Sequence, residues 1–203
     1  MADQKTKDYY NLNATFYGNV VPDPLGQFAS HQKRFIRRIN SGGHILDLRC
    51  GGGHATVVFI ENGFEVTALD GSAELAKIAS QRANIEVIVK DFSDLEFDCE
   101  FDGIWAAASL THVSLDALDD VLERVCRSLK PNGLLFASFK CADADWRDAE
   151  GRFYSAIGPH VLRQLALRSG LLVDSIDLGA CTAEINRLRA AHFWPNFALI
   201  FVT

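Results

Sequence analysis

The chain has 203 residues, 48% hydrophobic and 23% charged, a balance typical of a globular enzyme or binding domain and not of a disordered or fibrous chain. Its formal net charge of −6 opposes broad electrostatic attraction to nucleic acid or anionic lipid, so we expect small-molecule partners. Because the five cysteines form no Cys-x-x-Cys pair and the chain has neither a signal-peptide pattern nor a long apolar run, we expect reduced thiols and a cytoplasmic location.

The first 22 residues are aromatic for a terminal tail. They include Tyr9, Tyr10 and Tyr17, so we expect this segment to fold over something or to pack as a helix edge on the core. From 24 to 39, apolar residues recur at helical spacing, which predicts an amphipathic helix. Its other side is basic and is interpreted as a solvated face, with Lys33, Arg34, Arg37 and Arg38.

Short apolar or β-branched runs then alternate with helical patterns. Strands are predicted in the apolar first half of 44–56 and at 65–69, 85–89, 101–106, 134–139, 171–177 and 196–202, helices at 55–62, 73–82, 115–129 and 159–169, and a turn at 130–133. This alternation implies right-handed βαβ crossovers and a mostly parallel α/β sheet with helices on both faces. No repeat or linker marks a boundary, so we expect one domain, residues 1–203.

The stretch 44–56 is the most informative. Three consecutive glycines, Gly51 to Gly53, turn a buried strand into a helix, where the backbone can approach a ligand and the first helical N–H groups can hold an anion. A dinucleotide fingerprint is disfavoured by Thr56, and a phosphate loop is excluded because no Lys-Ser or Lys-Thr follows. S-adenosylmethionine fits better, since it offers a carboxylate to the loop and a ribose diol to Asp70.

A family resemblance rests on five segments: Ile45-Leu46-Asp47-Leu48-x-Cys50-Gly51-Gly52-Gly53, residues 66–72, Lys90-Asp91-Phe92, residues 101–106 and residues 129–133. Together, over about residues 35 to 140, they resemble the class I S-adenosylmethionine-dependent methyltransferases. Residues 108–113, 138–140 and 151–153 resemble a bacterial small-molecule branch related to tellurite-resistance-type methyltransferases. The resemblance implies a Rossmann-like seven-stranded sheet whose last strand is antiparallel. It also implies an N-terminal cover and helix (1–40), a cofactor-binding core (44–140) and an acceptor-side, sheet-completing segment (141–203).

The same resemblance implies the cofactor contacts. The methionine end would lie at Asp47 and the glycine loop, the ribose hydroxyls at Asp70, and the adenine at Asp91 with Phe92 beside the ring. The expected cofactor-binding residues are Asp47, Arg49, Cys50, Gly51, Gly53, Asp70, Gly71, Ser72, Asp91, Phe92, Ala106 and Ala107, the two alanines bordering the sulfonium.

Arg49 departs from the family pattern, which has its first glycine at this position. Its side chain could crowd the cofactor, pair with the cofactor carboxylate, or point away, and the sequence leaves all three open. If crowding prevents cofactor binding, the chain is a degenerate methyltransferase-fold binding or regulatory protein, which we keep as the alternative to an enzyme. A nicotinamide-dependent oxidoreductase is disfavoured by Thr56.

Methyl transfer from a sulfonium is an in-line displacement, to which a protein contributes mainly by aligning the reactants where water is excluded. His112 is the candidate catalytic base for an acceptor that must lose a proton, although a structural role is the commoner one for such a histidine. The histidines show no metal-ligand spacing, and Asp143, Asp145 and Asp148 are interpreted as a polar turn. The candidate substrate-binding residues are Tyr17, Lys140, Arg152 and Arg189, whose three cations are either a rim for an anionic acceptor or solvated surface charges.

Overall fold

The computed structural model describes residues 3–20, 27–142, 144–178 and 197–202. Strands β1 to β9 span His44–Leu48, Glu65–Asp70, Val87–Val89, Phe101–Ala106, Leu129–Lys140, Trp146–Arg147, Phe153–Tyr154, Val173–Leu178 and Phe197–Val202. Helices α1 to α7 span Gln4–Leu12, Ala14–Asn19, Gln27–Ile36, His54–Glu61, Ala73–Ala83, Leu115–Ser128 and Pro159–Arg168. Two 3-10 helices, η1 and η2, span Phe92–Asp94 and Leu110–His112.

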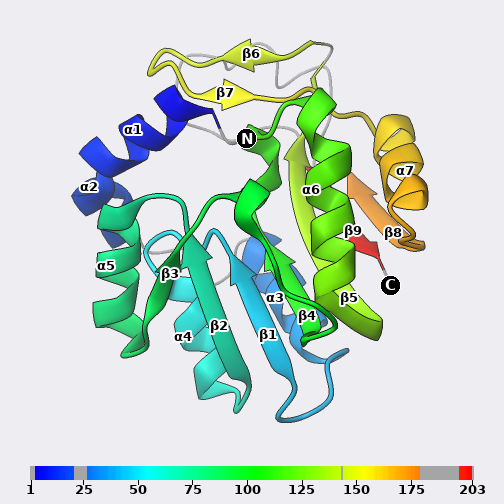
Figure 1. The fold of residues 1–203 in the computed structure, drawn as a ribbon, viewed down its shortest axis with the longest axis horizontal. Coiled ribbons are helices and arrows are strands. Elements are labelled where there is room, and N and C mark those ends of the chain that lie inside the picture. Colours follow the sequence, from blue (N-terminus) through cyan, green and yellow to red (C-terminus); the bar gives the residue numbers. More distant parts are fainter. Residues whose placement is uncertain (1–2, 21–26, 143, 179–196, 203) are drawn as a thin grey trace.

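Seven strands form one sheet in the order β3-β2-β1-β4-β5-β9-β8, and β6 pairs with β7 in a separate hairpin (Figure 1). Strands β3, β2, β1, β4 and β5 are parallel, which confirms the predicted Rossmann-like α/β sheet. Strand β9 runs antiparallel to both of its neighbours, β5 and β8. The five parallel strands bring their carboxyl ends to one edge, where ligands of such sheets bind.

Most observed elements lie close to the predicted ranges, and the turn predicted at 130–133 is the main difference. Those residues belong to β5, so the prediction of a separate turn is wrong. Asn132 has a φ of 64°, and the pairing register shifts between Phe101 and Gly103. The turn-forming residues therefore make an irregularity inside a strand, because pairing with β4 continues on both sides of it.

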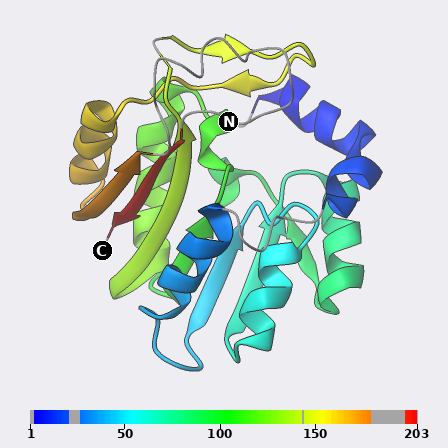
Figure 2. The same cartoon turned by 180° about the vertical axis from the view of Figure 1, so that it is seen from behind.

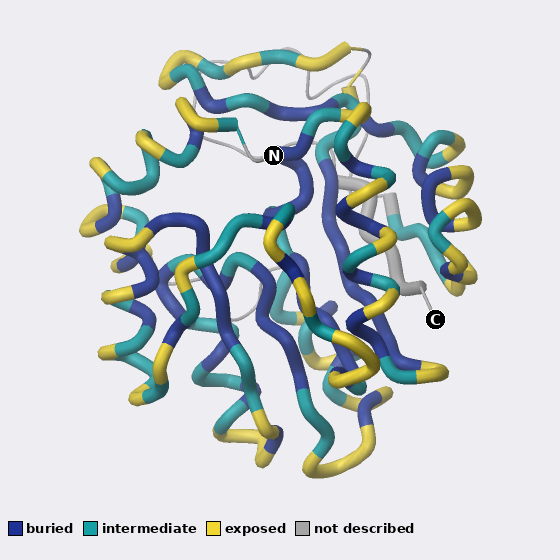
Figure 3. Tube along the Cα trace, viewed as in Figure 1, coloured by how far each residue is buried: buried dark blue, intermediate teal, exposed yellow. Residues whose placement is uncertain are grey.

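Helices α3, α4 and α5 cover one face of the sheet, and α6 and α7 cover the other (Figures 1 and 2). On the first face, Trp105 and Phe136 stack with ring centroids 4.0 Å apart, and Phe35 packs edge-on against Trp105. On the second face, α6 buries Leu118 and Leu122 at helical spacing. Buried residues accordingly gather along the strands and the inward sides of the helices (Figure 3).

The aromatic N-terminal segment forms α1 and α2, which lie beside α5 near the carboxyl edge of the sheet (Figure 1). Asp3 caps α1 by accepting a hydrogen bond from the backbone N–H of Thr6 at 2.9 Å. Gly18 of α2 lies so close to the glycine loop that a Cβ on Gly52 would be 2.6 Å from the Gly18 carbonyl oxygen. Helix α2 therefore packs directly against the glycine loop.

The β6–β7 hairpin lies over the same edge (Figure 1). Asp148 begins its turn, since the Asp148 carbonyl accepts a hydrogen bond from the Gly151 N–H at 3.0 Å. The sequence predicted a polar turn here but not the two short flanking strands, and Asp143 lies outside the described residues. None of the described helices combines the length and apolar character that crossing a bilayer requires.

Gly52→Ser tests the close contact between α2 and the loop. The new Cβ would meet the Gly18 backbone and the Arg82 guanidinium, so we expect the free energy of unfolding to fall by about 1–3 kcal/mol. Urea unfolding measures this. Gly158→Ser is the matched control, because no atom lies within 4 Å of its added Cβ and serine suits the N-cap position that Gly158 occupies. Equal stability of the two variants would contradict the contact.

Candidate functional site

The glycine loop adopts a backbone that requires glycine. Gly51 and Gly53 have φ values of 57° and 80°, in the left-handed region that side chains disfavour. The loop is tied to the end of β2, since the Cys50 N–H donates to the Leu69 carbonyl at 3.0 Å and the Gly51 N–H donates to Asp70 Oδ2 at 2.9 Å. No atom lies within 4 Å of a Cβ built on Gly51, so the backbone is open to a ligand there.

Three carboxylates from neighbouring strand ends meet beside this loop. Asp47 is buried and accepts a hydrogen bond from Thr56 Oγ1 at 2.6 Å; burial, reinforced by the charge of Asp70, raises the pKa of Asp47 to about 7. Asp70 also accepts the Ser72 N–H at 2.8 Å. Asp91 lies against the next turn, with Oδ1 3.0 Å from a Cβ built on Gly71. The structure thus brings together the three acids that the sequence placed at the carboxyl ends of β1, β2 and β3.

The remaining expected cofactor residues surround these acids. Phe92 follows Asp91 and is buried in η1, while Ala106 ends β4 and Ala107 is half-buried beyond it. Ser72 caps α5 through a hydrogen bond from the Leu75 N–H at 3.2 Å. Each of these groups follows the carboxyl end of a parallel strand, as a ligand site of this fold requires.

Helix α1 contacts the same groups, which no sequence pattern indicated. Lys7 Nζ lies 3.0 Å from Asp91 Oδ2, and Ser72 Oγ donates to Asn11 Oδ1 at 2.7 Å. The aromatic character of the N-terminus was the only available signal that this segment reaches the site. Part of the hydrogen-bonding capacity of Asp91 is therefore already used by the N-terminal helix.

Arg49 points into the site. Its φ is 63°, and its guanidinium carbon lies 5.5 Å from the Phe92 ring centroid and 5.7 Å from that of Tyr10. This excludes the possibility that the side chain points away. Nη1 is buried and has no hydrogen-bond partner among the described residues. A buried guanidinium nitrogen without a partner is costly, and an anion is the group that best satisfies it.

His112 is buried between α1 and the β6–β7 hairpin. Its Nδ1 lies 2.6 Å from the Phe153 carbonyl oxygen, so Nδ1 carries the proton and donates. Nε2 is left to accept from the Tyr10 hydroxyl at 3.3 Å. Burial, together with the positive charges of Arg49 and Lys140, lowers the pKa of His112 to about 3, so the ring is neutral near pH 7.

Arg152 is buried, so it is not one of the solvated surface charges that the sequence kept as an alternative to a cationic rim. Its Nε lies 2.6 Å from Asp148 Oδ2, and its Nη1 donates to the Tyr17 hydroxyl at 2.7 Å. Lys140 Nζ lies 3.5 Å from the Tyr154 ring centroid, and burial lowers its pKa to about 8. Arg189 lies outside the described residues.

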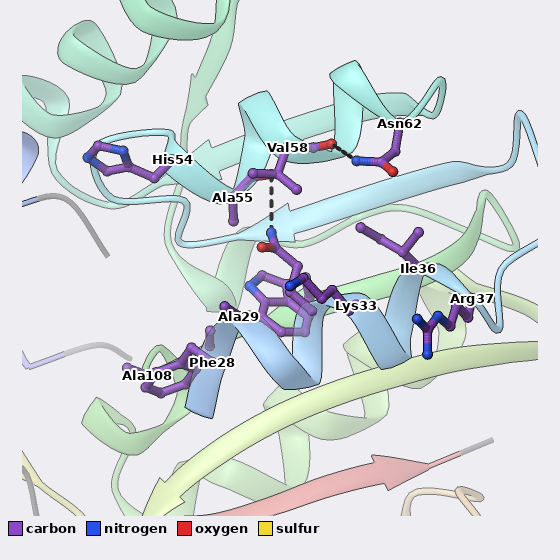
Figure 4. A pocket seen from close by; sticks show the side chains of 13 residues that line it. Phe28, Ala29, Lys33, Ile36, Arg37, His54, Ala55, Val58, Asn62 and Ala108 are labelled. Carbon is purple, nitrogen blue, oxygen red and sulfur yellow. Dashed lines mark hydrogen bonds between the residues drawn. The ribbon is translucent and has the colours of Figure 1, made fainter. Parts of the chain in front are cut away.

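A cavity of about 810 Å³ lies between α3 and α4, with Ala107 and Ala108 among its lining residues. The residues around it are drawn in Figure 4. Asp47, Asp70 and Asp91 do not line it, so the structure separates this space from the three carboxylates. The sequence did not predict it.

Part of the chain is similar to known methyltransferases. Residues 45–133 match the model of a methyltransferase domain. An uncharacterized methyltransferase of Staphylococcus carnosus is 31% identical over 93 residues, 46% of this chain and 45% of the relative. A malonyl-[acyl-carrier protein] O-methyltransferase of Enterobacter lignolyticus is 33% identical over 102 residues, 49% of this chain and 40% of the relative. The chain thus spans less than half the length of either relative.

Solved structures support the fold. A 1,6-didemethyltoxoflavin-N1-methyltransferase of Burkholderia thailandensis, crystallised with 1,6-didemethyltoxoflavin and S-adenosylhomocysteine, superposes with a TM-score of 0.77 at 19% identity, covering 98% of this chain and 87% of that one. At this identity the likeness establishes the fold alone. The matched domain and the strand order agree with this likeness, and together they support a class I S-adenosylmethionine-dependent methyltransferase fold.

Proposed function

We propose that this chain, working as one domain over residues 1–203, transfers a methyl group from S-adenosylmethionine to a small-molecule acceptor. The observation that carries the proposal is the open glycine loop tied to Asp70, with Asp91 beside the next turn and a buried Arg49 Nη1 that has no partner among the described residues. The malonyl-[acyl-carrier protein] relative is an O-methyltransferase and the toxoflavin-related enzyme is an N-methyltransferase, which supports the reaction type. The tellurite-resistance-type branch remains a prediction.

The residues present fit the cofactor. Arg49 Nη1 lacks a partner and would take the amino-acid carboxylate, while Asp70 keeps lone pairs for the ribose hydroxyls. Asp91 and Phe92 would hold the adenine, and Cys50 and Gly51 would present backbone to the methionine end. Asp47, Gly53, Gly71 and Ser72 would support these contacts, and Ala106 and Ala107 would border the sulfonium. When bound, the cofactor supplies an electrophilic methyl group.

The chain's own part is to bind, orient and exclude water. His112 presents an unprotonated Nε2 toward Tyr10, but a pKa of about 3 makes it a weak base near pH 7. We therefore assign His112 to orienting an acceptor hydroxyl, amine or thiol more than to removing its proton. Lys140 and Tyr17 would contact the acceptor from the neighbouring strand and from α2, and the Arg152 cluster would hold Tyr17 in place.

Calorimetric titration with S-adenosylhomocysteine tests the proposal. We expect the unaltered chain to bind, and Asp70→Asn to weaken binding by about 10- to 100-fold, the effect of losing charge-assisted hydrogen bonds. Asp98→Asn is the matched control, since Asp98 is exposed and remote from the three strand ends. An equal effect of both substitutions would contradict the assignment of Asp70.

Arg49 separates the enzyme from the degenerate alternative. If its guanidinium pairs with the cofactor carboxylate, Arg49→Gln weakens S-adenosylhomocysteine binding by about tenfold or more in the same titration. If the unaltered chain does not bind S-adenosylhomocysteine but Arg49→Gly does, the arginine side chain blocks the site and the chain is a binding or regulatory module. Binding of NAD in place of S-adenosylhomocysteine would instead establish the oxidoreductase.

The state of His112 is measurable by NMR. We expect its ring carbon-bound protons to show no titration between pH 5 and 8, because its pKa of about 3 lies below the range near 6.5 of a solvated histidine. Between about pH 6.5 and 3, His112 is protonated in the unfolded chain but neutral in the folded chain. The free energy of unfolding therefore decreases as the pH falls through this range. His112→Asn identifies the resonance. A midpoint near 6.5 would overturn the assigned tautomer and its orienting role.

A further inference from the structure

The cavity between α3 and α4 shares only Ala107 with the proposed cofactor site, among the described residues that line it. At about 810 Å³ it has the size of a small-molecule pocket, roughly 300–1,000 Å³. Gln32 Nε2 donates across it to the Ala55 carbonyl oxygen at 3.5 Å, as the dashed line in Figure 4 shows. The two helices therefore enclose a ligand-sized space above the sheet.

Most of the lining is apolar. Trp105 from β4 forms the sheet side, Phe28 and Ile36 come from α3, and Ala55 and Val58 come from α4. Figure 4 shows the side chains of Ile36 on α3 and of Ala55 and Val58 on α4. Such a surface favours a hydrocarbon or aromatic body over a strongly polar one, because burying polar groups without partners is unfavourable.

The polar lining is cationic. Arg34 and Arg38 of the basic stripe pair with Asp177 at 3.0 Å and Asp174 at 2.7 Å while remaining partly exposed, in keeping with the solvated face expected from the sequence. Lys33 and Arg37 instead line the cavity. Neither has an ion-pair partner in the part of the chain that the structure describes, and the lining residues include no carboxylate.

The cavity has two distinct ends. In Figure 4, His54 and Ala108 lie at one end and Arg37 and Asn62 at the other. The first end adjoins the tip of β4, where Ala107 is proposed to border the methyl group. From Ala29 to Ile36, α3 advances about 10 Å at 1.5 Å per residue. An occupant with its charge near Arg37 therefore reaches the tip of β4 if its apolar body is about as long as a medium-length alkyl chain.

We propose that this cavity binds an amphipathic carboxylate, with the carboxylate at Lys33 and Arg37 and the apolar body over Trp105. Binding follows from the cavity alone. Its assignment as the acceptor subsite rests on the proposed function, since it requires the cofactor's methyl group at Ala107. The acceptor class is then an elongated apolar molecule with an anionic group at the end remote from its methylated atom.

Calorimetry with decanoate as the probe tests the site, with decanol as the uncharged comparison. We expect decanoate to bind, and Lys33→Gln combined with Arg37→Gln to weaken it by about tenfold while leaving decanol binding unchanged. Val58→Trp should fill the space and abolish binding of both probes. Lys77→Gln, an exposed lysine on α5, is the charge control. Absence of decanoate binding, or binding that these variants leave intact, would overturn the proposal.

S-adenosylhomocysteine titrated into the same variants keeps the two proposals apart and shows that they are folded. Retained S-adenosylhomocysteine binding by Val58→Trp, with decanoate binding lost, supports a separate site. Binding of S-adenosylhomocysteine without decanoate rejects the cavity proposal and leaves the methyltransferase proposal standing. Binding of decanoate without S-adenosylhomocysteine keeps the carboxylate site but rejects the acceptor assignment and the proposed function.

Discussion

The hydrogen bond from the Gly51 N–H to the Asp70 carboxylate is the constraint on which the site depends. It joins the loop after β1 to the end of β2, and the neighbouring bond from Cys50 to Leu69 extends the same tie. An ionised acceptor strengthens such a bond, so the loop and the acid hold each other in position. Because Gly52 supports Gly18, the loop also determines where the N-terminal helices rest.

The sequence predicted the parallel sheet and the meeting of Asp47, Asp70 and Asp91 because both follow from local patterns: hydrophobic runs define the strands, and parallel strands present their carboxyl ends together. The N-terminal segment was expected to fold over something or to pack as a helix edge, but the ranges of α1 and α2 were not predicted, because α1 is mainly polar and α2 has only six residues. The sequence did not predict the β6–β7 hairpin, because each of its strands has two residues, which is too short to show a periodic pattern.

The directions in which the side chains of Arg49 and of the basic stripe point could not be predicted from the sequence either. Arg49 enters the site because Tyr10 and Phe92, distant along the chain, flank its guanidinium. The division of the basic stripe has the same origin, since Asp174 and Asp177 of β8 take two of its arginines. The cavity between α3 and α4 likewise depends on how far apart the two helices lie on the sheet, a tertiary quantity that no local pattern encodes.

Charge is distributed unevenly across the site. Carboxylates lie at the ends of β1 and β2 and after β3, whereas the cations Arg49 and Lys140 lie with the neutral His112 toward β4, β5 and the hairpin. Burial is the main cause of the raised pKa of Asp47 and of the lowered pKa of His112. The negative charge of Asp70 adds to the first shift, and the positive charges of Arg49 and Lys140 add to the second. A ligand with hydroxyl and amino donors at one end and an anionic group at the other would donate hydrogen bonds to the carboxylates and pair with the cations.

Helix α1 covers this arrangement through polar contacts. Lys7 meets Asp91, Asn11 meets Ser72, and Tyr10 meets His112. The N-terminal segment also buries Thr6, Ala14 and Gly18, and Gly18 lies against the glycine loop. The cover is therefore held by packing as well as by polar contacts, whereas the loop and its three acids are positioned by the sheet beneath them.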